Sequence, residues 1–324
     1  MKVDPAATQR LSCKEDIVST VLIRSTRDYS IFTICPRGGD AQAMYQAIKM
    51  QQLLSPHVVV ERNCVNVQLI TPTARHRLDV IAVLAQKDFK VRYRNSVLGF
   101  FWSLLNPLAY MVILTLVFSF LLRVSIPNFA AWVLIGLLIW RFFSTGTSQG
   151  LSSILANPSL VSKVYVPRYL IVLSNNLANF FGSSLEFLAL LPLLILLGVN
   201  LTAYALFLPV LLVLEFLLVF GLSLSLSSLN VKYRDFYQLW DIALQLGFFL
   251  SPIVYNGSLI PGRFQQLYSL NPITRLIESA RTIFLSDRLP SAFDNGVIFL
   301  SVTVLMLIGF VIFRRLERGF AEEL

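Results

Sequence analysis

From residue 98 onward, the chain alternates long hydrophobic runs with short polar connections. Six runs are long enough to cross the roughly 30 Å hydrocarbon core of a bilayer as helices. They cover residues 98–122, 129–150, 170–197, 201–229, 242–260 and 296–313. Continuous runs favour helices, because a membrane-spanning barrel would show hydrophobic and polar residues in alternation. The pattern therefore predicts an all-α integral membrane protein with six transmembrane helices.

The composition agrees with this pattern. Of the 324 residues, 56% are hydrophobic and 14% are charged, whereas soluble domains have about 45–50% and about 25%. The mean hydropathy is +0.68. Such a composition excludes disordered, collagen-like and disulfide-stapled secreted proteins.

The pattern changes near residue 78. Residues 1–77 mix polar, charged and short hydrophobic stretches. A cleaved signal peptide would show a basic segment followed by a hydrophobic one near the start, and residues 1–77 do not show this pattern. We expect an N-terminal extension of unknown role. It is either a small cytoplasmic appendage or sequence upstream of the true start, because Met44 and Met50 are available as internal starts. The six-helix domain then occupies residues 98–324.

Two segments outside the spans have an amphipathic pattern. In residues 78–97, hydrophobic residues at helical spacing stand beside basic ones such as Lys87 and Lys90. This predicts a helix in the membrane interface; the alternative is a charged lead-in to the first span. Residues 261–295 contain three prolines and predict short external helices before the last span, which we interpret as a lid over the outer mouth.

Basic residues in the connections indicate the orientation, since Lys and Arg accumulate on the cytoplasmic side. With the amino terminus inside, eleven basic residues near the membrane are cytoplasmic: Lys87, Lys90, Arg92, Arg94, Lys163, Arg168, Lys232, Arg234, Arg314, Arg315 and Arg318. Five are external: Arg123, Arg263, Arg275, Arg281 and Arg288. An even number of spans then leaves both termini in the cytoplasm.

Three ionisable residues lie inside the predicted spans: Arg141, Glu186 and Glu215. Such residues cost roughly 2.5–3.5 kcal/mol each on insertion and normally face protein or water. They either line a polar path or form an Arg–Glu pair between helices, and side chains near a helix end can also reach the interface.

A short basic motif occurs twice. Residues 91–95 read VRYRN and residues 231–235 read VKYRD. A three-plus-three inverted repeat would pair oppositely directed spans, whereas these copies precede spans of the same direction. The motif is therefore a shared interfacial device. Its candidates for contact with lipid phosphate are Arg92, Tyr93, Arg94, Lys232 and Arg234. Generic positive-inside anchoring is the alternative, and it is the interpretation that we favour.

The predicted internal loop at residues 151–169 contains a short amphipathic stretch that ends at Pro167. We interpret it as a contact for a soluble partner, since a few hydrophobic anchors can supply most of a binding energy. Its candidate residues are Leu160, Lys163, Tyr165, Pro167 and Arg168.

No catalytic, nucleotide-binding or metal-binding motif occurs. A Walker sequence, HExxH and GxSxG are all absent, and Cys13, Cys35 and Cys64 lack the spacing of a zinc or redox site. The net charge of +9 fits anionic lipid better than nucleic acid in a membrane protein. These features indicate a component that moves a substrate with energy from a gradient or from a partner.

At this level of detail, a set of ordered motifs resembles one family. They are KDFKVRYRNSVLG (87–99), LNPL (105–108), GLLIW (136–140), KVYVPR (163–168), LNVKYRD (229–235), FFLSPIVY (248–255), LNPI (270–273) and FRRLE (313–317). Together, over residues 79–324, they look like the permeases that export cell-surface polysaccharide by ATP-binding-cassette transport, including the O-antigen, teichoic-acid and polyol-phosphate exporters.

The resemblance implies a homodimer in the inner membrane, working with two separate ATPase subunits that bind ATP and Mg²⁺. It implies no cofactor or catalytic residue on this chain and a lipid-linked polysaccharide as cargo. Residues 151–169 would hold the helix that receives ATPase motion, and residues 261–295 the outer gate helices. Similar permeases have much shorter leaders than residues 1–77.

Aromatic residues near helix ends fit such a cargo, because their faces can stack on sugar rings; ordinary interfacial belts and helix packing are the alternative. The candidates for the channel or for helix pairing are Arg141, Glu186, Glu215, Phe142, Phe143, Phe249 and Tyr255. Two other functions stay open: an exporter of a drug, lipid or small molecule, and a membrane-embedded glycan-modifying enzyme. The enzyme would need a catalytic carboxylate or histidine, and residues 78–324 contain no histidine.

Overall fold

The structure is a computed structural model of the chain. It describes residues 19–24, 29–34, 58–61, 74–93, 100–123, 126–163, 167–257 and 261–323. The chain divides into two compact units, Met1–Thr73 and Ala74–Leu324. The division lies close to the change of sequence pattern near residue 78.

The described part of the first unit is a three-stranded antiparallel sheet in the order β2-β1-β3. Its strands are β1 (Ser19–Arg24), β2 (Tyr29–Ile34) and β3 (Val58–Glu61). Val21 of β1 stands opposite Phe32 of β2 and Val60 of β3. Short runs rich in β-branched residues favour strands. This sheet is an addition to the all-helical prediction.

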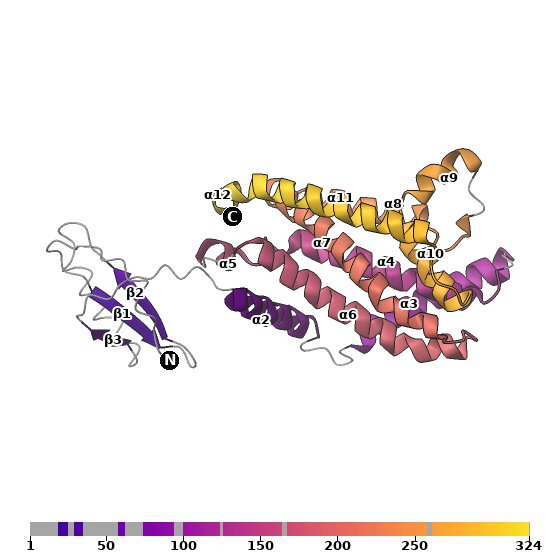
Figure 1. The fold of residues 1–324 in the computed structure, drawn as a ribbon, viewed down its shortest axis with the longest axis horizontal. Coiled ribbons are helices and arrows are strands. Elements are labelled where there is room, and N and C mark those ends of the chain that lie inside the picture. The colour runs from indigo at the N-terminus through magenta and orange to yellow at the C-terminus, as the bar shows by residue number, and fades with distance from the viewer. Residues whose placement is uncertain are drawn as a thin grey trace. The chain divides into compact units, whose positions relative to one another are not determined.

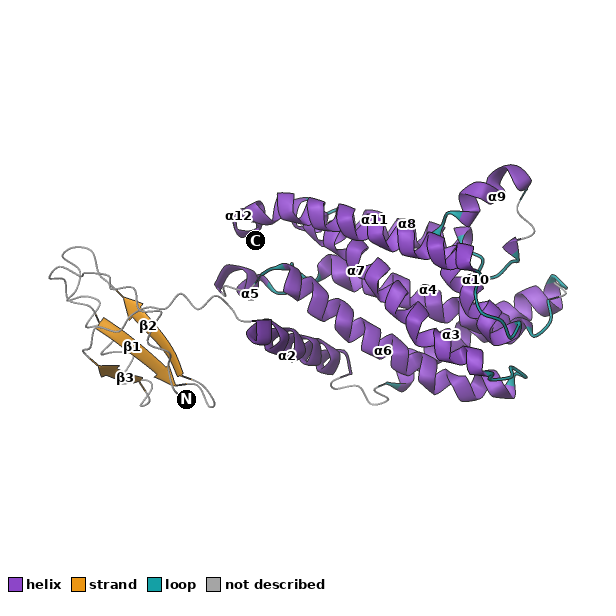
Figure 2. Ribbon diagram, viewed as in Figure 1, coloured by secondary structure: helices purple, strands orange, loops and turns teal. Residues whose placement is uncertain are grey.

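The described secondary-structure elements of the second unit are all helices, as predicted (Figures 1 and 2). In chain order, the elements are α2 (Ala74–Tyr93), α3 (Phe101–Thr115), the π-helical η2 (Leu116–Leu121), α4 (Phe129–Ser152), α5 (Pro158–Lys163), α6 (Tyr169–Leu196), η3 (Ala203–Phe207), α7 (Leu208–Lys232), α8 (Phe236–Leu250), α9 (Gly262–Ser269), α10 (Pro272–Leu285), α11 (Ala292–Leu316), η5 (Glu317–Gly319) and α12 (Phe320–Glu323).

Among the described residues, five helical stretches are long and hydrophobic enough to cross a membrane. They are Phe101–Leu121, Phe129–Ser152, Tyr169–Leu196, Ala203–Lys232 and Ala292–Gly319. They correspond to the first four predicted spans and to the last one.

The predicted span at residues 242–260 has a different form. Helix α8 begins earlier, at Phe236, and ends at Leu250, and residues 251–255 form turns and bends. A helix of 15 residues is about 22 Å long, which is less than the roughly 30 Å of a bilayer core. Pro252 has no backbone N–H and disfavours a longer helix. A sixth crossing therefore stays a prediction.

Helices α4 and α7 form the centre of the helical unit. Helix α7 contacts α4, α6, α10 and α11. In the most hydrophobic window of α4, 72% of the residues are buried within the chain, against 11% in the stretch formed by α3 and η2. Helix α3 therefore presents most of its surface to lipid or to another protein.

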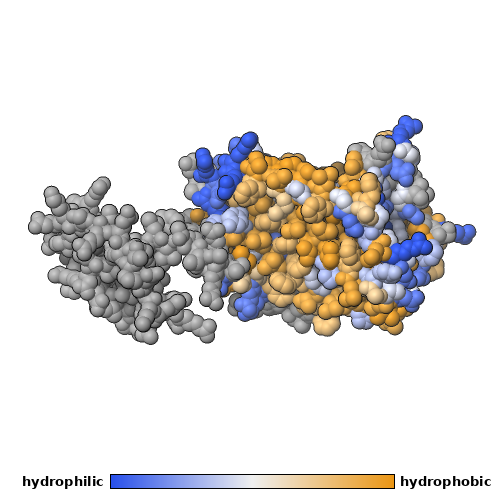
Figure 3. Space-filling model, viewed as in Figure 1, coloured by the Kyte–Doolittle hydropathy of each residue, from blue (hydrophilic) through white to orange (hydrophobic). Residues whose placement is uncertain are grey.

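The surface of the helical unit reflects this arrangement. Figure 3 shows a largely hydrophobic band over the middle of the visible face, with hydrophilic residues towards both ends. A bilayer solvates such a band and leaves the polar ends in water.

Candidate functional site

A cavity of about 620 Å³ is lined by three helices, α3, α4 and α8. Its lining residues recur every three or four positions, so each helix contributes one face. They are Asn106, Pro107 and Tyr110 from α3; Leu137, Trp140, Arg141, Ser144, Thr145, Ser148 and Gln149 from α4; and Asp241, Leu244, Gln245, Phe248 and Phe249 from α8.

One end of the cavity is polar and the other is aromatic. Helices α4 and α8 run in opposite directions, since Trp240 at the start of α8 donates to Thr147 near the end of α4, at 3.2 Å, while Gly247 lies against Trp140. The start of α8 thus brings Asp241 to the end of α4 that carries Ser148 and Gln149, which makes this end of the cavity polar. The opposite end contains the rings of Trp140 and Phe248 and is aromatic.

The aromatic end depends on close packing. The rings of Trp140 and Phe248 meet edge to face with centroids 6.1 Å apart. A Cβ atom at Gly247 would lie 2.9 Å from the Trp140 ring, so a glycine there permits the approach of the two helices.

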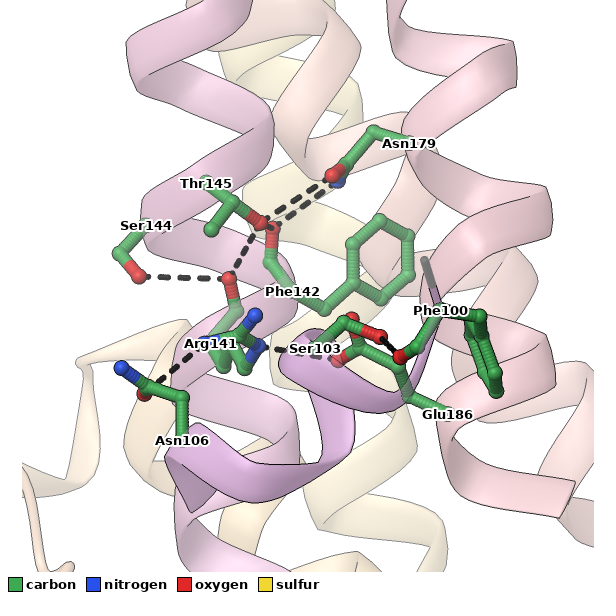
Figure 4. A network of polar contacts seen from close by, with 9 residues as sticks. All are labelled: Phe100, Ser103, Asn106, Arg141, Phe142, Ser144, Thr145, Asn179 and Glu186. Atoms are coloured by element: carbon green, nitrogen blue, oxygen red, sulfur yellow. Dashed lines mark hydrogen bonds and ion pairs between the residues drawn. The ribbon is translucent and has the colours of Figure 1, made fainter. Parts of the chain in front are cut away.

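Arg141 reaches the cavity from the middle of α4 and is held by two partners (Figure 4). Its Nε donates to Oε2 of Glu186 on α6 at 3.0 Å, and its Nη1 donates to Oδ1 of Asn106 on α3 at 2.9 Å. The Glu186 side chain is 8% exposed and that of Arg141 is 24% exposed. Arg141 thus links three helices, and its pairing with Glu186 neutralises a buried carboxylate, which would otherwise carry a large desolvation cost.

The Glu186 position continues a polar face along α6. Asn176, Asn179, Ser183 and Glu186 follow at intervals of three and four residues and are all buried. Asn179 accepts from Thr145 Oγ1 at 3.1 Å and donates to the carbonyl of Phe142 at 3.2 Å, as Figure 4 shows. Polar side chains that bond across helices hold such bundles together in membranes.

Glu215 lies apart from this network. It is fully buried on α7, and neither carboxylate oxygen has a hydrogen-bond partner among the described residues. It is absent from the lining of the cavity described above. The three ionisable residues singled out from the sequence therefore form one pair and one isolated group.

Of the aromatic candidates, one lines the cavity and the other three belong to or pack against the core of the bundle. Phe249 lines the cavity. Phe142 and Phe143 are buried in the core of the bundle, and Tyr255 packs against that core. Sequence reasoning did not single out Trp140, Asn106, Asp241 or Gln245 for the cavity. The spacing of polar and aromatic residues at positions 241, 245 and 248 could have indicated that one face of α8 lines a cavity.

The candidate partner contact begins at α5. Leu160 packs against a hydrophobic cluster at this end of the bundle, which contains Val161, Ile171, Phe313 and Phe320. Asn157, just before α5, accepts from Lys87 of α2 at 2.9 Å. The side chain of Lys163 and all of Tyr165 lie outside the described residues.

The other end of this segment is held by the end of the chain. Pro167 is partly buried, and Arg168 donates to the backbone carbonyl of Glu317. The Arg168 guanidinium also lies 5.8 Å from the centre of the Phe320 ring. Helix α12 contacts α5 directly.

The candidates for lipid phosphate are only partly described. Arg92 and Tyr93 lie in the last turn of α2, although their side chains, like the whole of Arg94, fall outside the described residues. Lys232 ends α7 and Arg234 follows it in a turn, and both are exposed. The ammonium group of Lys232 lies 5.4 Å from the Tyr233 ring centre.

A buried arginine at the opposite end of the bundle was counted from the sequence only as an external charge. Arg281 of α10 donates to the carbonyls of Trp132, Pro252 and Ile253, and its guanidinium lies 3.2 Å from the centre of the Trp132 ring. Burial lowers the pKa of Arg281 to about 9, so the group remains a cation at neutral pH. It connects α10 to α4 and to the turn that follows α8.

Comparisons with known proteins agree with this arrangement. Residues 79–285 match the ABC-2 type transporter family. The O-antigen export system permease protein RfbA of Klebsiella pneumoniae is 31% identical over 251 residues, which cover 76% of this chain and 95% of that protein. The protein of the same name from Myxococcus xanthus is 33% identical over 250 residues, 74% of this chain and 94% of its own length. The capsule polysaccharide export inner-membrane protein CtrC of Neisseria meningitidis is 22% identical over 243 residues, with coverage of 74% and 92%.

Membrane-spanning helices that line a polar and aromatic cavity are features of a transport permease. More specifically, the chain belongs to the ABC-2 type transporter family. The resemblance inferred from the ordered motifs is confirmed.

Proposed function

We propose that this chain is the permease subunit of an ATP-driven exporter that moves lipid-linked cell-surface polysaccharide, of O-antigen or teichoic-acid type, from the cytoplasmic to the outer side of the inner membrane. The observation that carries the proposal is the cavity, where Trp140 and Phe248 stand beside hydroxyl and amide groups. Such surroundings suit sugar rings, which offer apolar faces to aromatic rings and hydroxyls to polar groups. The relatives named for O-antigen and capsule export support it.

The proposed exporter contains two copies of this chain. The helices that flank the cavity, α3 and α8, expose large hydrophobic side chains, among them Phe101, Trp102, Leu239, Leu246 and Phe249. A second copy placed across these faces would bury them and close the open side of the cavity. The path for the glycan would then lie between the two copies.

Energy is proposed to come from two separate ATPase subunits that bind ATP and Mg²⁺, with no cofactor held by this chain. Helix α5 and Arg168 are their proposed contact. Because α5 contacts α12 and the residue just before it, Asn157, bonds to Lys87 of α2, a push on this segment would reach the spans directly.

The proposed topology has six crossings, with both termini in the cytoplasm. The proposed fifth crossing begins with helix α8, since its N-terminal end lies beside the end of α4. Helix α2 would lie in the inner interface. Helices α9 and α10 would form the gate at the outer mouth.

The function is tested by deleting the gene in its host and measuring the polysaccharide on the cell surface and the lipid-linked polysaccharide inside. We expect loss of surface polymer and accumulation of the lipid-linked form, with rescue by the wild-type chain. Trp140→Ala should rescue poorly, because it removes an aromatic face of the cavity. Phe299→Ala, at an exposed aromatic residue of α11, is the matched control.

Unchanged surface polysaccharide in the deletion strain would contradict the proposal and favour export of a drug, lipid or small molecule. A surface polymer of normal amount but altered chemical structure would instead indicate a glycan-modifying enzyme.

A further inference from the structure

The charge balance of the cavity is unequal. The lining contains one basic and one acidic side chain, Arg141 and Asp241. The charge of Arg141 is balanced by Glu186 at 3.0 Å. Asp241 is exposed, and among the described side chains no Lys or Arg lies within ion-pair distance of it. Asp241 is therefore a charged lining residue that has no ion-pair partner among the described side chains.

The surroundings of Asp241 add hydrogen-bonding capacity to this charge. Gln245, one turn further along α8, donates to Oδ2 of Asp241 at 2.9 Å. The other carboxylate oxygen has no hydrogen-bond partner among the described residues. A carboxylate accepts strong hydrogen bonds from hydroxyl groups, and sugar hydroxyls are abundant donors. The same carboxylate repels anions, and salt screens this repulsion because the side chain is exposed.

We infer that Asp241 is a specificity-determining residue, which makes the cavity selective for neutral, hydroxyl-rich polysaccharide over polyanionic chains such as uronate or phosphate polymers. The inference rests on the proposed function. Of the two polymer types named there, it retains neutral polysaccharide and excludes polymers of the teichoic-acid type. Rejection of a competing ligand by a like charge is a general route to specificity.

The lipid carrier is outside this restriction. In the proposed function its phosphate groups contact Lys232 and Arg234, which are exposed at the end of α7. Selection at Asp241 therefore acts on the sugar chain alone.

The test compares two oligosaccharides of equal length, neutral maltoheptaose and acidic heptagalacturonate. Their binding to the full-length chain, in lipid nanodiscs with the subunits that co-purify, is measured by equilibrium dialysis at low salt. We expect the wild type to bind the neutral sugar at least about fivefold more tightly, a ratio that salt reduces, because screening weakens repulsion between charges.

Two substitutions then isolate the charge. Asp241→Asn keeps the size of the side chain and should bring the ratio close to one. Asp241→Lys should favour the acidic sugar. The matched control is Glu323→Lys, which makes the same charge change at an exposed residue of α12 and should leave the wild-type ratio unaltered.

Equal binding of both sugars by the wild type would overturn the inference, as would a ratio in Asp241→Lys that equals the ratio in Glu323→Lys. In either case the proposed glycan path would stand, because the neutral sugar still binds. Failure of both sugars to bind the wild type would instead refute the glycan path, and the inference with it.

Discussion

At the scale of single residues, the membrane interior decides which charged side chains can be tolerated. Arg141 and Glu186 lie 45 positions apart in the sequence, and their pairing could be offered from the sequence only as one of several explanations. The structure shows the pair, with Asn106 as a further partner. Which faces of α3, α4 and α6 meet is determined by packing, and local sequence carries little information about it.

Breaking this pair should destabilise the helical unit. Arg141→Gln leaves Glu186 buried without a cation and should cost about 2–3 kcal/mol of folding free energy, less than the roughly 3–5 kcal/mol of fully buried pairs because Arg141 is partly exposed. The double variant Arg141→Gln/Glu186→Gln should recover much of the loss. Thermal unfolding in detergent measures both, with Arg288→Gln at an exposed position as control. Additive losses in the double variant would contradict a direct pair.

At the scale of elements, five of the six hydrophobic runs correspond to the helical stretches that are long enough to span a membrane. Hydrophobic run length did not predict the shape of α8, since the hydrophobic run continues through Pro252 while the helix ends at Leu250. It also missed the sheet of the first unit, whose strands of four to six residues are too short for a decisive pattern. Asp241 escaped notice because one acidic residue near a helix start has no meaning until the opposite wall is known.

The crossing of α7 and α11 requires glycine. A Cβ atom at Gly309 would lie 2.0 Å from the carbonyl oxygen of Gly221, and backbone cannot yield as a flexible side chain can. Gly309→Ala should therefore destabilise the bundle by about 1–3 kcal/mol, as overpacking does in other cores.

The matched control for Gly309 is Gly296→Ala in the same helix, where a Cβ atom meets nothing within 4 Å. That change should be neutral or stabilising by about 0.5–1 kcal/mol, because alanine loses less backbone entropy in a helix. The melting temperature of Gly309→Ala should therefore be lower than that of Gly296→Ala. Equal values would show that the crossing of α7 and α11 can relax to accept a Cβ atom.

At the scale of the whole helical unit, distant parts of the chain meet on both sides of α5, at Asn157 and Arg168. Lys87 of α2 bonds to Asn157 on one side, and Arg168 bonds to Glu317 beside Phe320 on the other. The sequence indicated a partner contact in residues 151–169. It did not indicate that the end of the chain supports it, because this depends on where α11 returns to the bundle.

Loss of that support should weaken ATPase coupling. Arg168→Glu and Phe320→Ala should each lower stimulation of ATP hydrolysis by the permease about threefold or more, in line with coupling energies of about 0.5–2 kcal/mol. Charge reversal at Lys163 should act in the same direction. The exposed Arg315→Ala is the control, and ATPase rates of the assembled complex provide the readout. Wild-type stimulation in both Arg168→Glu and Phe320→Ala would remove α5 from the coupling route.

The most direct measurement of transport uses the purified chain, reconstituted in vesicles with its ATPase subunits and a lipid-linked polysaccharide on the ATPase-exposed side. We predict that the polysaccharide becomes accessible on the opposite side only when both ATP and this chain are present. Hydrolysis of nucleotide or modification of sugar by the purified chain alone, or ATP-dependent translocation in its absence, would contradict its role as the permease.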